Sequence, residues 1–183
     1  MRKLIFILLC AALLAGVLGG CGSLSDSDHG DTLHIVTTIF PIYDWVSEII
    51  GEDQEGVELT MLLDNGVDLH SYQPTADDIV TISSCDMFLY IGGESDEWVA
   101  DVLAESANPD MVAVNLLEVL GDKAKIETLV EGMEAEDEAD AEAEFDEHIW
   151  LSLKNAQVLC QYISDQLCAL DPAGQALYCG NTS

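Results

Sequence analysis

The chain has 183 residues and a formal charge of −30, from 35 Asp and Glu against 5 Lys and Arg. This length suits one principal domain rather than several. The charge excludes nucleic acid as a partner, because proteins that bind phosphates need clustered Lys and Arg. Hydrophobic residues make up 49% of the chain, which is too many for a wholly disordered acidic protein, so a core should form.

Residues 1–20 have the features of a secretory signal peptide. Arg2 and Lys3 precede an apolar stretch from Leu4 to Leu18. The sequence Leu18-Gly19-Gly20-Cys21 resembles a bacterial lipobox, in which cleavage leaves Cys21 as a lipidated N-terminus. The alternative is an ordinary signal followed by a chance cysteine. We expect an exported lipoprotein, anchored at the outer face of the cell membrane or in the periplasm, with a flexible stalk at residues 21–32.

Residues 33–130 alternate between short β-branched runs and longer helical patterns. Strands are predicted at 33–38, 57–63, 86–91 and 111–116, and helices at 40–51, 75–83 and 96–106. Alternation of this kind is typical of βα units that feed a parallel sheet. We therefore predict an α/β fold, a Rossmann-like lobe with a four-stranded parallel sheet.

The composition changes abruptly at residues 131–147, where ten of seventeen residues are acidic. Like charges at helical spacing oppose a helix, so we expect a mobile acidic loop. A long helix is predicted over residues 148–170, and its apolar positions cover more than one face, so it should need contacts on two sides. If the chain ends soon afterwards, an apolar patch on this helix should stay exposed and favour dimerisation or aggregation.

Four cysteines follow Cys21, namely Cys85, Cys160, Cys168 and Cys179. Their spacing contains no C-x-x-C pair and no dense disulfide framework. On one helix, Cys160 and Cys168 would lie ~12 Å apart, which is too far for a disulfide. These cysteines are expected to be core thiols.

Two histidines are well placed to bind a metal ion. His70 lies in a turn-rich loop after the second predicted strand, and His148 lies between the acidic loop and the long helix. Ligands of open α/β sheets bind beyond the carboxyl ends of the strands, and imidazole is the commonest transition-metal ligand. Spacing alone leaves open that two histidines seventy-eight residues apart never meet.

Three segments, 35–44, 68–74 and 147–153, resemble the zinc and manganese ABC-transporter substrate-binding lipoproteins, the ZnuA-like family. The resemblance implies two Rossmann-like lobes joined by a long rigid helix, with Zn²⁺ or Mn²⁺ held between them. It also implies the permease and ATPase subunits of a metal importer as partners. Carried over by position, His70 and His148 match the first two metal-binding histidines. The family's other two ligands come from a C-terminal lobe, so the resemblance implies a truncated form in which residues 171–183 begin that lobe.

Further ligands could come from water or from Glu144, Asp146 or Glu147. We expect weak and poorly discriminating metal binding, because ordering a mobile carboxylate costs entropy. Two other functions stay open: a non-transporting fragment of such a protein, or an exported metallohydrolase with Glu147 as its general base. The acidic loop is either a trap for hard cations or simply a solvated segment.

Overall fold

Four parallel strands form the centre of the computed structural model, which describes residues 32–51, 55–64, 66–125 and 145–183. The strands are β1 (Leu33–Thr37), β2 (Val57–Met61), β3 (Met87–Tyr90) and β4 (Val112–Asn115). Their order is β2-β1-β3-β4, and Ile35 of β1 pairs with Leu59 on one side and Met87 on the other. Because β2 and β3 flank β1, the sheet has a topological switch point between β1 and β3, where open α/β sheets bind ligands.

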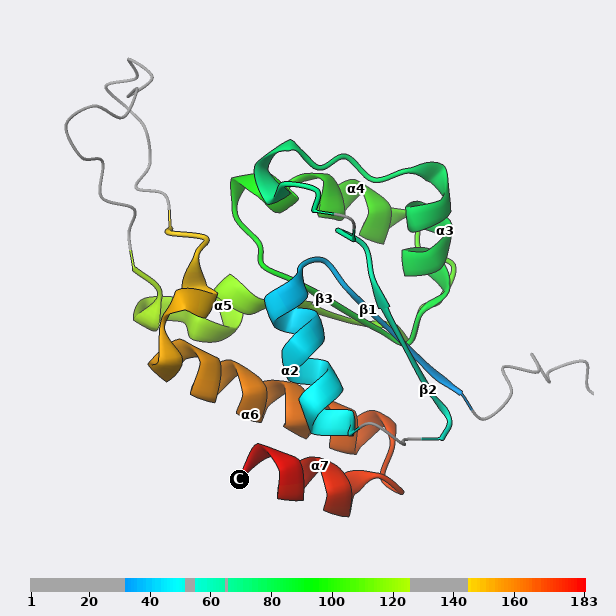
Figure 1. Cartoon of the computed structure of the whole chain (residues 1–183). Helices are drawn as coiled ribbons and strands as arrows, with labels where there is room; N and C mark the ends of the chain where they lie inside the picture. The colour runs from blue at the N-terminus through cyan, green and yellow to red at the C-terminus, as the bar shows by residue number, and fades with distance from the viewer. Residues whose placement is uncertain (1–31, 52–54, 65, 126–144) are drawn as a thin grey trace, which may run out of the picture. The chain divides into compact units, whose positions relative to one another are not determined.

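Helices cover both faces of this sheet. In Figure 1, α3 (Ala76–Ser84) and α4 (Trp98–Ala104) lie on one side, and α2 (Phe40–Ile50) and α6 (Leu153–Leu170) lie on the other. The short α5 (Leu116–Leu120) contacts α6, and α7 (Gln175–Thr182) packs against α2 and α6. The described residues also form four 3₁₀ turns: η1 (Leu69–Ser71), η2 (Glu94–Asp96), η3 (Gly121–Lys123) and η4 (Ile149–Leu151).

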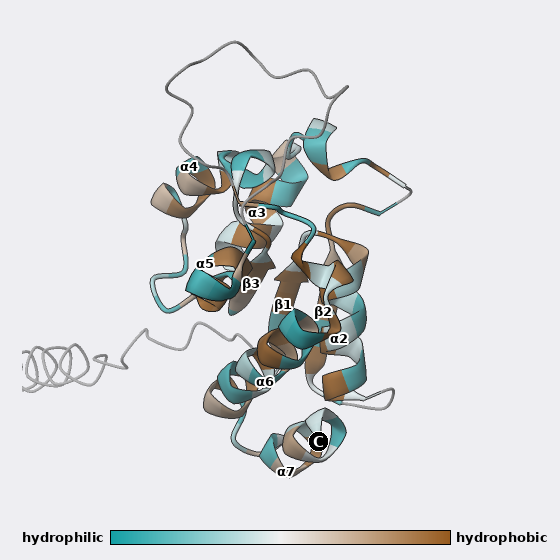
Figure 2. Cartoon of the chain, turned by 90° about the vertical axis from the view of Figure 1, so that its left-hand side faces the viewer, coloured by the Kyte–Doolittle hydropathy of each residue, from teal (hydrophilic) through white to brown (hydrophobic). Residues whose placement is uncertain are grey.

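The core lies between the sheet and its two helical layers. In the central strands, Ile35, Met87, Phe88 and Leu89 are fully buried, as expected where helices cover both faces of a parallel sheet. Figure 2 shows these strands as hydrophobic ribbon enclosed by helices with polar outer faces. The apolar positions of the helix predicted at residues 40–51 form the buried face of α2.

The predicted four-stranded parallel sheet is confirmed, with differences of one or two residues at the ends of its strands. The helix predicted at 96–106 is shorter in the structure, where the η2 turn ends at Asp96 and α4 runs over Trp98–Ala104. Thr75, the first residue of the predicted helix 75–83, caps α3, accepting a hydrogen bond from the Asp78 N–H in a capping box.

The long helix begins later than predicted. Residues 149–151 form the η4 turn, and α6 starts at Leu153 because the Ser152 side chain caps it, accepting from the Asn155 N–H. Its buried residues face α2, α5 and α7, whereas Leu153 is 84% exposed at its N-terminal end. None of the helices in the described ranges is long and apolar enough to span a membrane.

Several predicted features lie outside the described residues. They are the signal peptide, Cys21, most of the stalk, and residues 126–144, which include Glu144.

Candidate metal centre

Three loops at the carboxyl edge of the sheet bring the two predicted histidines together. His70 lies in η1, after β2, and His148 directly precedes η4. The centroids of their rings are 5.6 Å apart, with the ring planes tilted by 47°. Two imidazoles that share one tetrahedral zinc ion have centroids about 5 Å apart, given Zn–N bonds of about 2.0–2.1 Å. The two side chains are therefore spaced as a pair of ligands would be.

A chain of hydrogen bonds determines which nitrogen of His70 is available. The Ser95 hydroxyl lies 2.5 Å from Glu147 Oε2 and 2.9 Å from His70 Nδ1. A carboxylate only accepts, so the hydroxyl donates its proton to Glu147, and its oxygen must accept from His70 Nδ1–H. In this tautomer, Nε2 carries the free electron pair that binds a metal.

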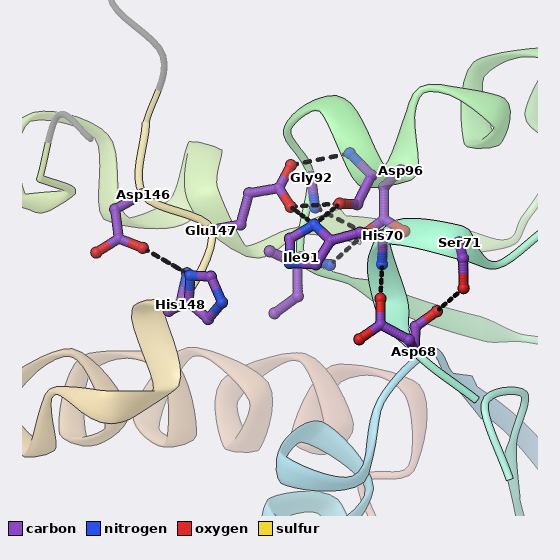
Figure 3. Close-up of polar contacts among 10 residues, drawn as sticks. Asp68, His70, Ser71, Ile91, Gly92, Asp96, Asp146, Glu147 and His148 are labelled. Atoms are coloured by element: carbon purple, nitrogen blue, oxygen red, sulfur yellow. Dashed lines mark hydrogen bonds and ion pairs between the residues drawn. The ribbon is translucent and has the colours of Figure 1, made fainter. Parts of the chain in front are cut away.

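His148 is oriented by a carboxylate in the same way. Its Nδ1 lies 3.0 Å from Asp146 Oδ1, and its backbone N–H donates to the same oxygen at 2.9 Å. The pKa of Asp146 is lowered, mainly by the hydrogen bond from that backbone N–H. Nδ1–H therefore donates to Asp146, and Nε2 of His148 is also left free. Figure 3 shows Asp146 beside the His148 ring and Glu147 beside His70.

Glu147 is buried and hydrogen-bonded, although it was expected to end a mobile acidic loop. Its side chain is only 10% exposed, and both carboxylate oxygens accept hydrogen bonds from Ser95, Oε1 from the backbone N–H at 2.9 Å and Oε2 from the hydroxyl. The carboxylate fits closely over Gly93, where any Cβ would collide with Glu147 Oε1. Glu147 therefore positions His70 through Ser95 instead of projecting freely toward a metal.

Ser95 is a site residue that the sequence did not reveal. It lies in η2, directly after β3 and the Gly92-Gly93 pair. The feature that could have pointed to Ser95 is its position in the sequence directly after β3, which places it at the carboxyl edge of the sheet, next to the switch point. An isolated serine carries no motif, and its partner Glu147 is fifty-two residues away in the sequence.

Asp96 closes the turn that carries Ser95. It is 4% exposed, and Oδ2 accepts hydrogen bonds from the backbone N–H groups of Ile91 at 2.9 Å and Gly92 at 3.0 Å. Burial raises the pKa of Asp96 to about 6, although the two backbone hydrogen bonds oppose this shift. Asp96 thus fixes the η2 turn from inside the protein.

The described residues supply two ligands at most in one place. His70 and His148 are both partly exposed, with 55% and 44% of their side chains accessible. Within residues 32–51, 55–64, 66–125 and 145–183, no group of three or more His, Cys, Asp or Glu side chains is arranged to hold a metal ion. The centre is an open pair of imidazoles, to which water or other groups must add.

Comparison with known proteins places this chain in a family. The family model described as "Zinc-uptake complex component A periplasmic" (ZnuA) matches residues 35–183. The chain belongs to the ZnuA family. Among individual relatives, the high-affinity zinc uptake system protein ZnuA of Bacillus subtilis is 30% identical over 181 residues, which cover 95% of this chain and 54% of that protein.

Two further relatives bear names that refer to different metals. The manganese-binding lipoprotein MntA of Halalkalibacterium halodurans is 28% identical over 96% of this chain and 52% of its own length. The crystal structure of Zn(II)-bound AdcA from Streptococcus pneumoniae superposes with a TM-score of 0.62 and 28% identity, covering 82% of this chain and 29% of that one. The ZnuA-like chain described here therefore spans about half the length of the curated ZnuA and MntA proteins.

Proposed function

We propose that this chain captures a divalent transition metal, Zn²⁺ or Mn²⁺, as a substrate-binding lipoprotein of an ABC importer, whose permease and ATPase subunits receive the ion. The observation that carries the proposal is the convergence of His70 and His148, with ring centroids 5.6 Å apart, from segments far apart in the sequence. Membership of the ZnuA family and the names of the zinc and manganese relatives support the same conclusion.

The donor chemistry supports a transition metal as the cargo. Each imidazole donates Nδ1–H to an oxygen acceptor, which leaves Nε2 of both rings free for the ion. Imidazole suits zinc, whereas a site with more carboxylate ligands would suit manganese. Two imidazoles alone therefore favour zinc, and Asp146 and Glu144 stay candidates as auxiliary ligands.

The proposal also assigns a role to each region of the chain. Residues 1–20 direct export, Cys21 carries the lipid anchor, and residues 21–32 form the stalk. Residues 33–130 are the metal-binding lobe, 131–147 the acidic loop, 148–170 the linking segment, and 171–183 the beginning of a second lobe. The words "periplasmic" and "lipoprotein" in the names of the family and of MntA support export and anchoring.

The alternative of a metallohydrolase has less support. A base must be free to take a proton from a metal-bound water. Both oxygens of Glu147 instead accept hydrogen bonds from Ser95. This observation favours binding over catalysis.

The double substitution His70→Ala/His148→Ala tests the site. We expect transition-metal binding at this site, measured by isothermal titration with zinc and by zinc-induced thermal stabilisation, to be lost, while weak carboxylate-driven association of cations remains. His34→Ala is the matched control, because His34 lies in β1 and pairs with Glu58 at 3.3 Å, away from the carboxyl edge. Zinc-induced stabilisation that is unchanged in the double variant would refute the assignment.

The affinity of the unaltered chain is a separate prediction. Two partly exposed imidazoles supply half of the four ligands that closed zinc sites use. We therefore expect a dissociation constant in the micromolar range or weaker, with little discrimination between metals. A nanomolar dissociation constant for the monomeric chain would show that other groups complete the site.

A further inference from the structure

Two cysteine thiols face each other where α6 meets α7. Cys168 lies in the last turn of α6, Cys179 lies in α7, and their Sγ atoms are 3.9 Å apart. Cys179 is exposed and Cys168 is partly buried. The pair is separate from the metal centre, because fifteen residues of helix, roughly 22 Å, lie between Leu153 at the start of α6 and Cys168.

Other contacts already hold the backbone on both sides of this pair. Asp171, in the turn between the helices, accepts hydrogen bonds from the Tyr178 hydroxyl at 2.5 Å and the Ala173 N–H at 3.0 Å. Tyr178 is fully buried, and Asn181 Nδ2 donates to the carbonyl oxygen of Ile49 in α2 at 3.0 Å. The two thiols are thus kept close together without any covalent bond between them.

The other two cysteines in the described ranges are occupied differently. Cys85 is buried, and its Sγ lies 3.5 Å from the sulfur of Met111. Cys160 lies two turns before Cys168 on the same helix, ~12 Å away, which is beyond the reach of a disulfide. Among the cysteines in the described ranges, Cys168 and Cys179 are therefore the pair placed to form a disulfide.

We propose that Cys168 and Cys179 form a disulfide bond in the exported protein, and that this bond ties α7 to α6. A disulfide has an S–S length of about 2.0 Å, so the sulfur atoms must approach by about 2 Å. Rotation of the exposed Cys179 side chain about χ1 moves its sulfur without moving either helix. Export supplies an oxidising compartment, where disulfides form and persist.

The oxidant is a disulfide compound, either glutathione disulfide or an exported dithiol–disulfide oxidoreductase. The thiolate of the exposed Cys179 attacks the oxidant's disulfide, which forms a mixed disulfide and releases one thiol. The Cys168 thiolate then attacks the Cys179 sulfur, and the second thiol leaves. Both cysteines are oxidised, two electrons pass to the oxidant, and the two protons end on its thiols.

The bond should stabilise the end of the chain. It closes a loop of twelve residues, from Cys168 to Cys179, and so restricts the unfolded state. We expect the melting temperature of the oxidised protein to exceed that of the reduced protein by about 5–10 °C. Zinc binding should be the same in both forms, because the disulfide lies at the opposite end of α6 from His148.

The test begins with the full chain expressed with export, and with free thiols alkylated at the moment of lysis. Mass spectrometry of a non-reduced digest should show the Cys168 and Cys179 peptides linked and Cys160 alkylated. In protein that has been reduced after purification, glutathione disulfide should raise the melting temperature of the unaltered chain and of the matched control Cys160→Ser. It should leave the melting temperatures of Cys168→Ser and Cys179→Ser unchanged.

Two results would overturn the proposal. One is recovery of Cys168 and Cys179 fully alkylated both from the cells and after treatment with glutathione disulfide. The other is an equal rise in melting temperature in Cys179→Ser, which would trace the effect to another cysteine. Neither result bears on the metal centre, whose own test uses the two histidines.

Discussion

At the scale of single residues, Ser95 connects the buried carboxylate of Glu147 to the imidazole of His70. Metal-binding histidines commonly donate their second nitrogen to an oxygen acceptor, which fixes the tautomer and the orientation of the ring. Here a hydroxyl stands between the ring and the carboxylate. Its removal should release the ring without removing a ligand.

Ser95→Ala should weaken zinc binding about tenfold or more, because partners of this kind contribute roughly 10–100-fold to metal affinity. Nitrogen NMR of the imidazole should show Nδ1 protonated in the unaltered protein and a mixture of tautomers in the variant. Ser95→Thr keeps the hydroxyl and should restore both properties. Ser84→Ala is the control, because that hydroxyl bonds only to backbone carbonyl oxygens of α3. An unchanged tautomer in Ser95→Ala would contradict the role of Ser95.

Asp96 should make the folded protein less stable as pH rises. Its pKa is raised to about 6 in the fold, so between about pH 4 and 6 the unfolded chain loses this proton before the folded chain does. Stability is thus highest below the unfolded pKa and falls by about 3 kcal/mol once both forms are ionised. In Asp96→Asn this part of the pH dependence should disappear, as measured by denaturant unfolding at several pH values. Parallel pH profiles for the two proteins would contradict the assignment.

At the scale of elements, the turn after β3 depends on a glycine. Gly93 has φ of +81°, and a Cβ there would collide with the carboxylate of Glu147. Gly93→Ala should therefore strain the backbone and also displace Glu147 from Ser95. Gly66→Ala also places a side chain at a positive φ, +75°, but its Cβ meets no atom within 4 Å.

Both glycine variants should lose roughly 1–2 kcal/mol of stability from the strained backbone. Only Gly93→Ala should also lose zinc affinity, by about tenfold, because it disturbs the partner of His70. Thermal unfolding and zinc titration of the two proteins separate these effects. Equal zinc affinity in both variants would show that Glu147 has no part in the site.

The capping box of α3 is a second test at this scale. Thr75 accepts from the Asp78 N–H at 3.2 Å, and Asp78 accepts from the Thr75 N–H at 2.8 Å and from the Tyr72 hydroxyl at 2.9 Å. Thr75→Ala should cost about 1 kcal/mol in denaturant unfolding, the usual contribution of such a cap. Thr81→Ala is the control, because that exposed hydroxyl bonds to a carbonyl oxygen of its own helix.

At the scale of the whole molecule, the sequence predicts the sheet better than it predicts the site. Burial on both faces makes β3 a continuous apolar run and gives β1 its β-branched pair Ile35-Val36, so the places and type of both strands could be predicted from local pattern. The start of α6 could not, because Ser152 and the short η4 turn decide it locally. The proximity of His70 and His148 could be predicted from their motifs. The Ser95–Glu147 contact could not, because it depends on packing between segments far apart in the sequence, and neither segment carries a motif for it.

The high negative charge of the chain should also act on the whole molecule. With a formal charge of −30, long-range attraction concentrates divalent cations around the protein. Because 0.15 M salt screens charges beyond about 8 Å, the association rate of zinc should fall several-fold between low and physiological ionic strength. Stopped-flow measurements in NaCl, with sucrose as an uncharged control, can check this. A rate independent of salt would show that the field of the chain has no part in capture.

The backbone N–H of Asp146 donates to the carbonyl oxygen of Lys125 at 2.8 Å. This bond joins Lys125 to Asp146, the residues that bracket positions 126–145, close to His148. Since lengthening a loop costs little once its ends are held together, insertions and deletions between them should leave the histidine where it is. Changes in the composition of this stretch, which is acidic here, should therefore alter the charge around His148 without altering the fold of the sheet and helices that carry the histidine.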